Sequence, residues 1–80
     1  MIYVYCIMST VKNWLYVGMT DAIDRRVSQH NKGQNRSTAP YRPFKLLFTE
    51  CYEDRAAARV REKYLKGASG KRWIRKTYGV

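Results

Sequence analysis

Titratable and reactive side chains are scarce in this 80-residue chain, which has one histidine, two cysteines and six acidic residues. Ribonuclease chemistry that pairs one imidazole base with one imidazole acid needs two histidines. This chain has only His30, so that chemistry is excluded. A two-metal phosphodiesterase site needs several clustered carboxylates. Three of the six acids have simpler assignments, Asp21 and Asp54 as helix caps and Asp24 in a first helical turn. A site with several carboxylates is therefore not expected.

Motifs of nucleophilic hydrolases and nucleotide-binding proteins are also missing. The chain has no Gly-x-Ser-x-Gly sequence and no glycine-rich phosphate loop. Cys6 and Cys51 lie in apolar, strand-like stretches without the close pairing of a zinc site, and we expect both to be reduced core residues. No apolar run reaches transmembrane length, and we recognise no lipidation or secretory signal. We therefore expect a cytoplasmic protein with no membrane partner.

Positive charge is what the sequence has in excess. Sixteen Lys and Arg residues against six Asp and Glu residues give a formal net charge of +10 at pH 7. Residues 55–80 carry nine basic residues against one acidic residue, so a local net charge of +8 lies there. Such a field attracts polyanions, and each neutralised phosphate adds affinity through counterion release. Nucleic acid is the expected partner, because a membrane surface would also require an apolar face or a lipid anchor.

Hydrophobic patterning predicts one small α+β domain over residues 1–80, too short for a second core. Alternation, N-cap and glycine signals predict the order β-β-α-β-α-α, with a three-stranded, mostly antiparallel sheet flanked by helices. The expected strands are Ile2–Met8, Trp14–Met19 and Phe44–Tyr52. The first expected helix runs from its cap Asp21 to about Lys32 and is closed by Gly33. The second covers Arg55–Lys66 with Asp54 as its cap, and a shorter third helix is capped by Ser69. Gly33–Pro43 is expected to be a polar loop.

The alternation also predicts which side chains share a face of the sheet. In the first strand Val4 and Cys6 are expected on one face and Tyr5 on the other. In the third strand Phe44 and Phe48 are expected on one face.

One histidine and one arginine form the first candidate pair. Arg26 and His30 are four residues apart, so they share one face of the expected helix, and Ile23 and Val27 place that face toward the sheet. The simpler interpretation is that His30 ends an apolar stripe and Arg26 extends past it to solvent. A guanidinium there could equally hold a phosphate and stabilise charge that develops during its hydrolysis.

Glu62 is the one acid in the basic final third of the chain. It could simply form a surface ion pair with Lys66, four residues on. Its helical spacing from Ala58 and Leu65 instead places it on a side that can face the sheet, where a carboxylate would suit Mg²⁺ completed by water and phosphate. Tyr5 and Tyr16 also have a structural alternative, because tyrosine is common in strands.

Five segments together resemble the GIY-YIG nuclease superfamily, in particular its small single-domain branch. They are Tyr3–Tyr5 (YVY), Tyr16–Thr20 (YVGMT), Arg25–Asn31 (RRVSQHN), Pro43–Leu47 (PFKLL) and Ala58–Lys66 (ARVREKYLK). That branch is related to the N-terminal nuclease module of the bacterial excision-repair nuclease and to structure-selective endonucleases. Five motifs in order over nearly the whole chain are specific, where a single one would be weak.

The resemblance implies a role for each matching residue. Tyr5 or Tyr16 would position or activate the attacking water, Arg26 would bind the scissile phosphate, and His30 would assist one of these groups. Glu62 would hold one divalent ion, Mg²⁺ or Mn²⁺. Gly18 would let the strand lie close to the substrate. The predicted nucleic-acid contacts are Gly18, Thr20, Arg25, Lys66, Lys71 and Arg72.

The chain departs from the family pattern at three positions. Tyr3 stands where the first motif opens with glycine, and Met19 replaces a lysine found after the second motif in the repair nucleases. No asparagine follows Glu62, although several members place one in the site; Ser69 or Thr77 could substitute.

The leading hypothesis is a metal-dependent endonuclease that hydrolyses DNA phosphodiesters with little sequence specificity, on single-stranded or structured DNA. Two alternatives keep the fold without independent catalysis. The first is a nucleic-acid-binding module that uses Tyr41 and Trp73 for base stacking. The second is an accessory subunit that is active only with a partner.

Overall fold

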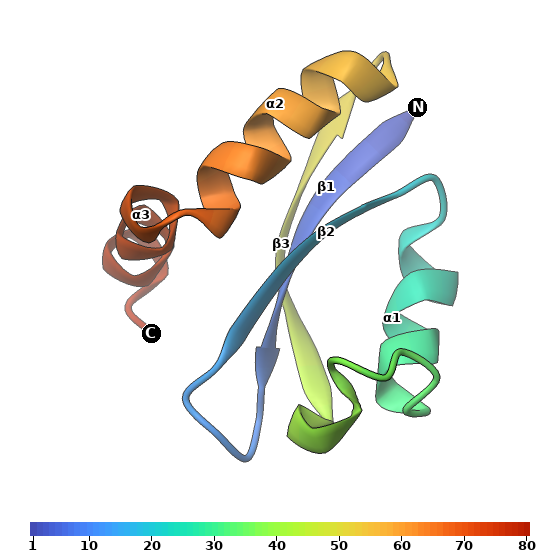
Figure 1. The fold of residues 1–80 in the computed structure, drawn as a ribbon, viewed down its shortest axis with the longest axis vertical. Helices are drawn as coiled ribbons and strands as arrows, with labels where there is room; N and C mark the ends of the chain where they lie inside the picture. Colours follow the sequence, from blue (N-terminus) through green and yellow to red (C-terminus); the bar gives the residue numbers. More distant parts are fainter.

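The computed structural model describes residues 1–80 throughout and has the predicted order of elements (Figure 1). These elements are β1 (Ile2–Ser9), β2 (Leu15–Thr20), α1 (Ile23–Asn31), a 3₁₀ turn (Ala39–Tyr41), β3 (Phe44–Tyr52), α2 (Arg55–Lys66) and α3 (Ala68–Tyr78). The three strands form one antiparallel sheet in the order β2-β1-β3. The predicted α+β fold class is therefore confirmed. The 3₁₀ turn inside the polar loop was not predicted.

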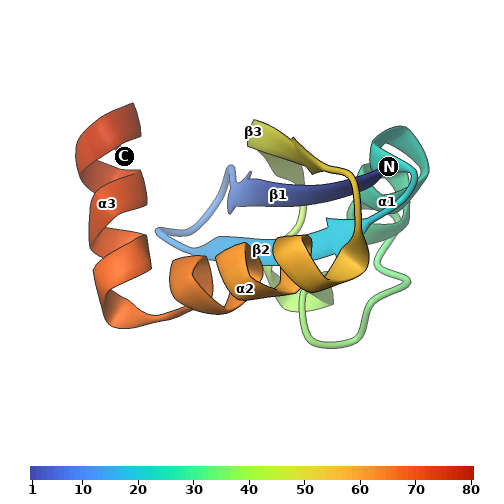
Figure 2. The ribbon, with the colours of Figure 1, turned by 90° about the horizontal axis from the view of Figure 1, so that it is seen from above.

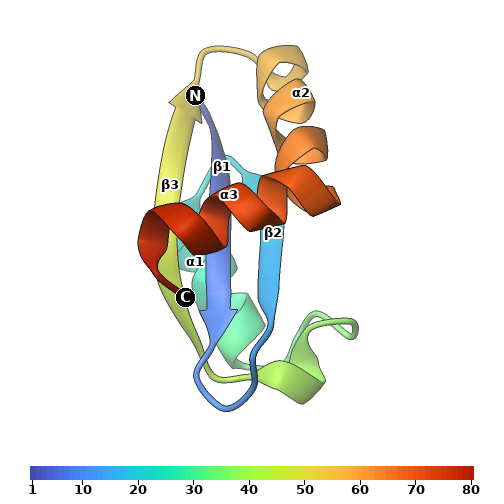
Figure 3. The same ribbon diagram turned by 90° about the vertical axis from the view of Figure 1, so that its left-hand side faces the viewer.

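The helices cover both faces of the sheet. In Figure 1 the sheet is seen nearly edge-on, with α1 on one side and α2 and α3 on the other. Figure 2 shows α2 running alongside β2, and Figure 3 shows α3 crossing the same face of the sheet. The edge of the sheet at β2 is thus where elements from the two halves of the chain come together.

The alternation of β1 separates two apolar clusters, as predicted. Val4 and Cys6 face α2 and α3, in a cluster completed by Leu15, Val17, Ala58, Leu65 and Ile74. Tyr5 and Ile7 face α1, together with Phe44. One strand therefore anchors both layers and carries Tyr5 into the second.

The prediction that Phe44 and Phe48 share a face is wrong. Phe44 packs in the cluster on the α1 face, whereas Phe48 packs against the cluster under α2 and α3. The cause is an irregularity in the β1–β3 register: Cys6 pairs with Phe48 and Ile7 with Leu46, leaving Leu47 as an extra residue. One inserted residue reverses the alternation beyond it.

Two of the three predicted helix caps are wrong. The Asp54 carboxylate accepts the Ala57 backbone N–H at 2.8 Å, as predicted. Asp21, however, does not cap α1; its carboxylate pairs with Arg25 at 3.1 Å. Ser69 lies inside α3, whose N-cap is Gly67. Gly33 ends α1 as predicted, in the left-handed region with φ 76°.

The two cysteines differ in environment. Both are free thiols, but only Cys6 is in the core, where burial raises its pKa to about 12. Cys51 is exposed, so its assignment to the core is wrong. No helix of the protein is both long and apolar enough to cross a membrane.

Candidate active site

The candidate site begins where the Tyr5 ring lies over Gly18. The two residues pair across β1 and β2. A Cβ atom built on Gly18 would stand 2.6 Å from the Tyr5 hydroxyl oxygen and 2.8 Å from the Cζ of that ring. Tyr5 is 1% exposed, so its ring cannot easily move away. Glycine is therefore required here for a steric reason: without a side chain at Gly18, the Tyr5 ring of β1 can lie across the backbone of β2.

Gly18→Ala is expected to destabilise the fold by about 1–3 kcal/mol, because the added methyl overlaps a buried aromatic ring. Urea unfolding measures this directly. Gly67→Ala is the matched control, since its added Cβ would meet only backbone oxygens at 3.4 Å and 3.9 Å. Equal stability of both variants and wild type would contradict this account of Gly18.

His30 links Tyr5 to the polar loop through two short hydrogen bonds. Its Nε2 lies 2.8 Å from the Tyr5 hydroxyl, and its Nδ1 lies 2.8 Å from the Thr38 hydroxyl. Thr38 also donates to the Asn35 carbonyl at 3.3 Å. The tautomer with its proton on Nδ1 suits all three contacts, because Thr38 then accepts from Nδ1–H and the Nε2 lone pair can accept the proton of Tyr5. Thr38 was missed by the sequence analysis, because nothing local distinguishes it from the other polar residues of its loop.

Burial keeps both partners of the Tyr5–His30 pair neutral at physiological pH. Burial raises the pKa of Tyr5 to about 12, although the Arg26 guanidinium acts in the opposite direction. Burial also lowers the pKa of His30 to about 4, and repulsion from Arg26 adds to this effect. Ionised Tyr5 and protonated His30 are therefore both rare in the resting protein near pH 7.

The depressed pKa of His30 predicts pH-dependent stability. In the unfolded chain His30 binds a proton below about pH 6.5, whereas in the folded protein it stays neutral down to about pH 4. The unfolded state thus binds more protons in this window, and stability falls as the pH is lowered. Between pH 7 and pH 5 we expect a loss of about 2 kcal/mol in the free energy of unfolding.

Urea unfolding at the two pH values tests this. His30 is the only histidine, so a His30→Gln variant should show little change over the same interval. An equal loss in the variant would contradict the assignment to His30.

Tyr16 stands beside this pair on the same face of the sheet. Its ring centroid lies 6.4 Å from that of Tyr5 and 5.1 Å from that of His30. The Lys66 ammonium is 5.5 Å from the centre of the Tyr16 ring. Tyr16 is only partly buried, whereas Tyr5 is 1% exposed.

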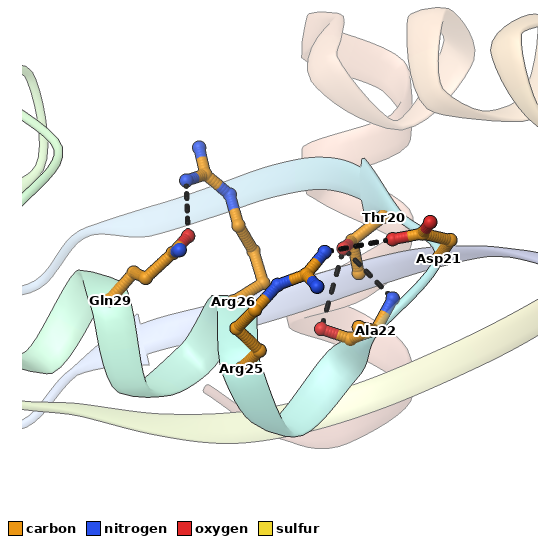
Figure 4. Close-up of polar contacts among 6 residues, drawn as sticks. All are labelled: Thr20, Asp21, Ala22, Arg25, Arg26 and Gln29. Atoms are coloured by element: carbon orange, nitrogen blue, oxygen red, sulfur yellow. Dashed lines mark hydrogen bonds and ion pairs between the residues drawn. The ribbon is translucent and has the colours of Figure 1, made fainter.

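Arg26 and Arg25 are adjacent in sequence but differ in what they contact. Figure 4 shows Arg25 turned to Asp21, while Arg26 extends away from α1 with Gln29 beside it. The Gln29 side-chain oxygen accepts from Arg26 at 3.1 Å. Arg26 has no carboxylate partner within ion-pair distance, and it affects the pKa of both Tyr5 and His30. An arginine without a carboxylate partner beside a phenol is suited to bind an anion.

Glu62 approaches the same point from α2, on the opposite side of β2. It is 7% exposed and shares the buried stripe of Ala58 and Leu65, as its spacing indicated. Its carboxylate pairs with Arg59 at 3.7 Å and with Lys66 at 3.5 Å. The simpler interpretation of Glu62, an ion pair with Lys66, therefore also holds in part. Its charge adds to the factors that raise the pKa of Tyr5.

All five predicted catalytic residues are therefore brought to one place. Tyr5, Tyr16, Arg26 and His30 come from the α1 side, and Glu62 comes over the β2 edge. The arrangement unites two strands and two helices that are far apart in sequence. The roles of these residues remain predictions.

The predicted nucleic-acid contacts are less uniform. Gly18 lies under the Tyr5 ring, and Thr20 is 8% exposed with its hydroxyl bonded to the Ala22 backbone at 3.1 Å and 3.4 Å (Figure 4). Arg25 is exposed but paired with Asp21. Lys71 and Arg72 lie on α3, outside the cluster around Tyr5. Of the four basic residues among the six, Lys66 is the one that contacts catalytic candidates, Glu62 and Tyr16.

The donor set fits a single hard cation. No group of three His, Cys, Asp or Glu side chains is close enough together to hold a metal ion. Mg²⁺, however, is commonly bound through one or two carboxylates, with water and substrate phosphate completing its shell. Glu62 supplies one such carboxylate, held by its helix at the edge of the site. The cations beside it, Arg59 and Lys66, are exposed enough to turn toward a phosphate.

Comparison with known proteins gives the class and the family of this domain. Residues 1–78 match the model of the GIY-YIG catalytic domain, and the chain belongs to the GIY-YIG family. Domains of this family are typical of endonucleases.

Several relatives are UPF0213 proteins. One from Natronomonas pharaonis is 35% identical over 68 residues, covering 84% of this chain and 79% of the relative. One from Haloquadratum walsbyi is 37% identical over 65 residues, covering 80% and 72%. One from Clostridium perfringens is 36% identical over 65 residues, covering 80% and 69%. No solved structure matches the chain significantly.

Proposed function

We propose that this protein is an endonuclease that hydrolyses DNA phosphodiesters by direct attack of water, with one Mg²⁺ or Mn²⁺ ion bound at Glu62. The observation that carries the proposal is the convergence on Tyr5 of His30, Arg26, Tyr16 and Glu62. A module that only bound nucleic acid would need the arginine but not the nearly buried carboxylate beside it. The whole chain acts as a single domain in this proposal.

Arg26 supplies the phosphate-binding group. A guanidinium can donate two parallel N–H bonds to phosphate oxygens. Because Arg26 has no competing carboxylate, it can make these bonds without first breaking an ion pair. As water adds to phosphorus, negative charge grows on the same oxygens, and the interaction strengthens in the transition state.

Tyr5 orients the attacking water as a neutral phenol. Its pKa of about 12 excludes a resting phenolate as the base. In this proposal Tyr5 donates its proton to His30, so its oxygen can accept one hydrogen bond from Arg26 and one from the attacking water. When the water loses its proton to Tyr5, the phenol proton can pass to Nε2 of His30 in the same step. Thr38 keeps His30 in the tautomer that can accept it.

Glu62 would hold the divalent ion. The bound ion would neutralise charge on the scissile phosphate and lower the pKa of a nearby water. The bond between the water oxygen and phosphorus would form as the bond from phosphorus to the leaving oxygen breaks, and the leaving oxygen would take a proton from solvent. The many exposed basic residues of α2 and α3 would contact the phosphate backbone of the DNA, which gives affinity with little sequence preference.

A cleavage assay on labelled single-stranded, duplex and flap DNA tests the proposal, with Mg²⁺, Mn²⁺ or EDTA present. We expect cutting that requires the metal and that weakens with added salt. Binding without cutting under every condition would instead support a non-catalytic module. Cutting that appears only with an added partner protein would support an accessory subunit.

A further inference from the structure

Three aromatic rings form a row that leads along the surface to the candidate site. Trp14 and Tyr16 flank Leu15 at the start of β2 and both pack on the α1 face. Tyr41, in the 3₁₀ turn, stacks on Trp14 with ring centroids 4.0 Å apart and planes 10° apart. Tyr16 adjoins His30 at 5.1 Å. We refer to Tyr41, Trp14 and Tyr16 as the aromatic row. All three residues are only partly buried.

The step between Trp14 and Tyr16 is wider than the step between Tyr41 and Trp14. Their centroids are 6.2 Å apart and their planes differ by 26°. The spacing follows from the strand, because side chains two residues apart on a strand stand roughly 6.6 Å apart. It is close to twice the rise of about 3.4 Å between stacked bases. A planar base would enter between these rings once they move apart by roughly 0.6 Å.

A cation stands at each end of the aromatic row. The Lys12 ammonium is 5.5 Å from the centre of the Tyr41 ring, and the Lys66 ammonium is 5.5 Å from the centre of the Tyr16 ring. No acidic residue pairs with Lys12. Flat rings with a positive charge at both ends suit a ligand that alternates bases with phosphates.

We propose that the aromatic row binds unpaired nucleotides of a polynucleotide, with one base stacked between Trp14 and Tyr16 and phosphates at Lys12 and Lys66. The inference rests on the proposed function and names the form of its substrate. A base held beside Tyr16 places the adjoining phosphodiester next to the Tyr5–His30 pair. Stacking of bases on rings does not depend on the sugar, so DNA and RNA strands should both bind.

The aromatic row favours unpaired over duplex nucleic acid for an energetic reason. A base in a duplex is already stacked on both sides and paired, so entering the Trp14–Tyr16 step would require its extrusion. An unpaired base loses much less when it moves onto a protein ring. The second tryptophan does not offer a similar surface: Trp73 packs edge-on against Phe48 and Tyr78, under the Arg61 guanidinium.

Oligonucleotide binding in EDTA tests the proposal without any cleavage. A labelled oligothymidylate of about ten nucleotides spans the site sizes usual for single strands. Trp14→Leu is expected to weaken binding about five-fold or more, the lower end of the range for loss of one stacked base. Trp73→Phe is the matched control and should bind as wild type does. Oligouridylate should bind like oligothymidylate, and a duplex of equal length should not depend on Trp14.

An abasic strand provides the decisive second arm. Removing the bases keeps the phosphates, so wild type should bind the abasic strand more weakly, while Trp14→Leu should bind both strands alike. Fluorescence of Trp14 in the Trp73→Phe variant should be quenched by the single strand only. If wild type does not distinguish abasic from intact strands, or if duplex quenches Trp14 equally, the proposal is overturned. Because this binding is measured without metal, failure of cleavage leaves the result intact, and the converse also holds.

Discussion

Replacing Glu62 with glutamine is expected to reduce metal-dependent cleavage by about 10³-fold or more while the protein stays folded. Glu62 supplies the one carboxylate of the proposed metal site, and an amide of the same shape is a far poorer ligand for a hard cation. The substitution leaves Arg59 and Lys66 without their partner, but both are well exposed and can be solvated. We therefore expect a change of no more than about 1 kcal/mol in the free energy of unfolding.

Glu50→Gln is the matched control for Glu62→Gln. Glu50 also pairs with an arginine, at 2.8 Å and 3.2 Å from Arg61, and this contact lowers the pKa of Glu50. Because Glu50 lies on β3, its loss should lower stability without preventing cleavage. Cleavage rates at saturating Mn²⁺ and urea unfolding of both variants separate the two effects. If Glu62→Gln retained full metal-dependent activity, another group would have to hold the ion.

Arg26→Lys is expected to lower the cleavage rate by about 10²–10³-fold, even though the charge is conserved. Lysine cannot make the two parallel bonds of a guanidinium to one phosphate, so stabilisation of the transition state is lost. Single-turnover rates on a saturating substrate measure this loss. Arg25→Lys, at the neighbouring exposed position, should change the rate by no more than a few-fold.

A second measurement on Arg26 is independent of activity. The guanidinium contributes to the low pKa of His30 by repelling the imidazolium. In an Arg26→Met variant the pKa of His30 should therefore rise, although burial will still hold it below its usual range. An NMR titration of His30 gives both values. An unchanged pKa would show that Arg26 does not lie against the Tyr5–His30 pair.

Much of the candidate site was predicted because its residues follow local rules. The four-residue spacing of Arg26 and His30 places them on one face of a helix wherever that helix packs. The spacing of Glu62 from Ala58 and Leu65 does the same for α2, whose stripe is buried, while Ile23 and Val27 of α1 are partly buried against the cluster around Tyr5. Such patterns depend on the period of an element, which neighbouring residues determine.

Contacts between distant elements could not be predicted in the same way. The bond from Tyr5 to His30 joins residues 25 positions apart, and the bond from His30 to Thr38 depends on the path of the polar loop. The reversed face of Phe48 comes from one extra residue in the β1–β3 pairing. Asp21 looked like a cap by composition, yet in the folded chain its carboxylate meets Arg25 instead.

The sequence by itself determined the order of the elements, the two faces of β1, the positive field and the family to which the chain belongs. The tertiary structure alone decided how these parts act on one another. It placed Tyr5 over Gly18, joined the two ring nitrogens of His30 to the hydroxyls of Tyr5 and Thr38, left Arg26 without a carboxylate partner, and set Trp14 beside Tyr16. The physical reason is that periodicity and charge are properties of short segments, whereas hydrogen-bond geometry and burial arise only when separate segments pack together.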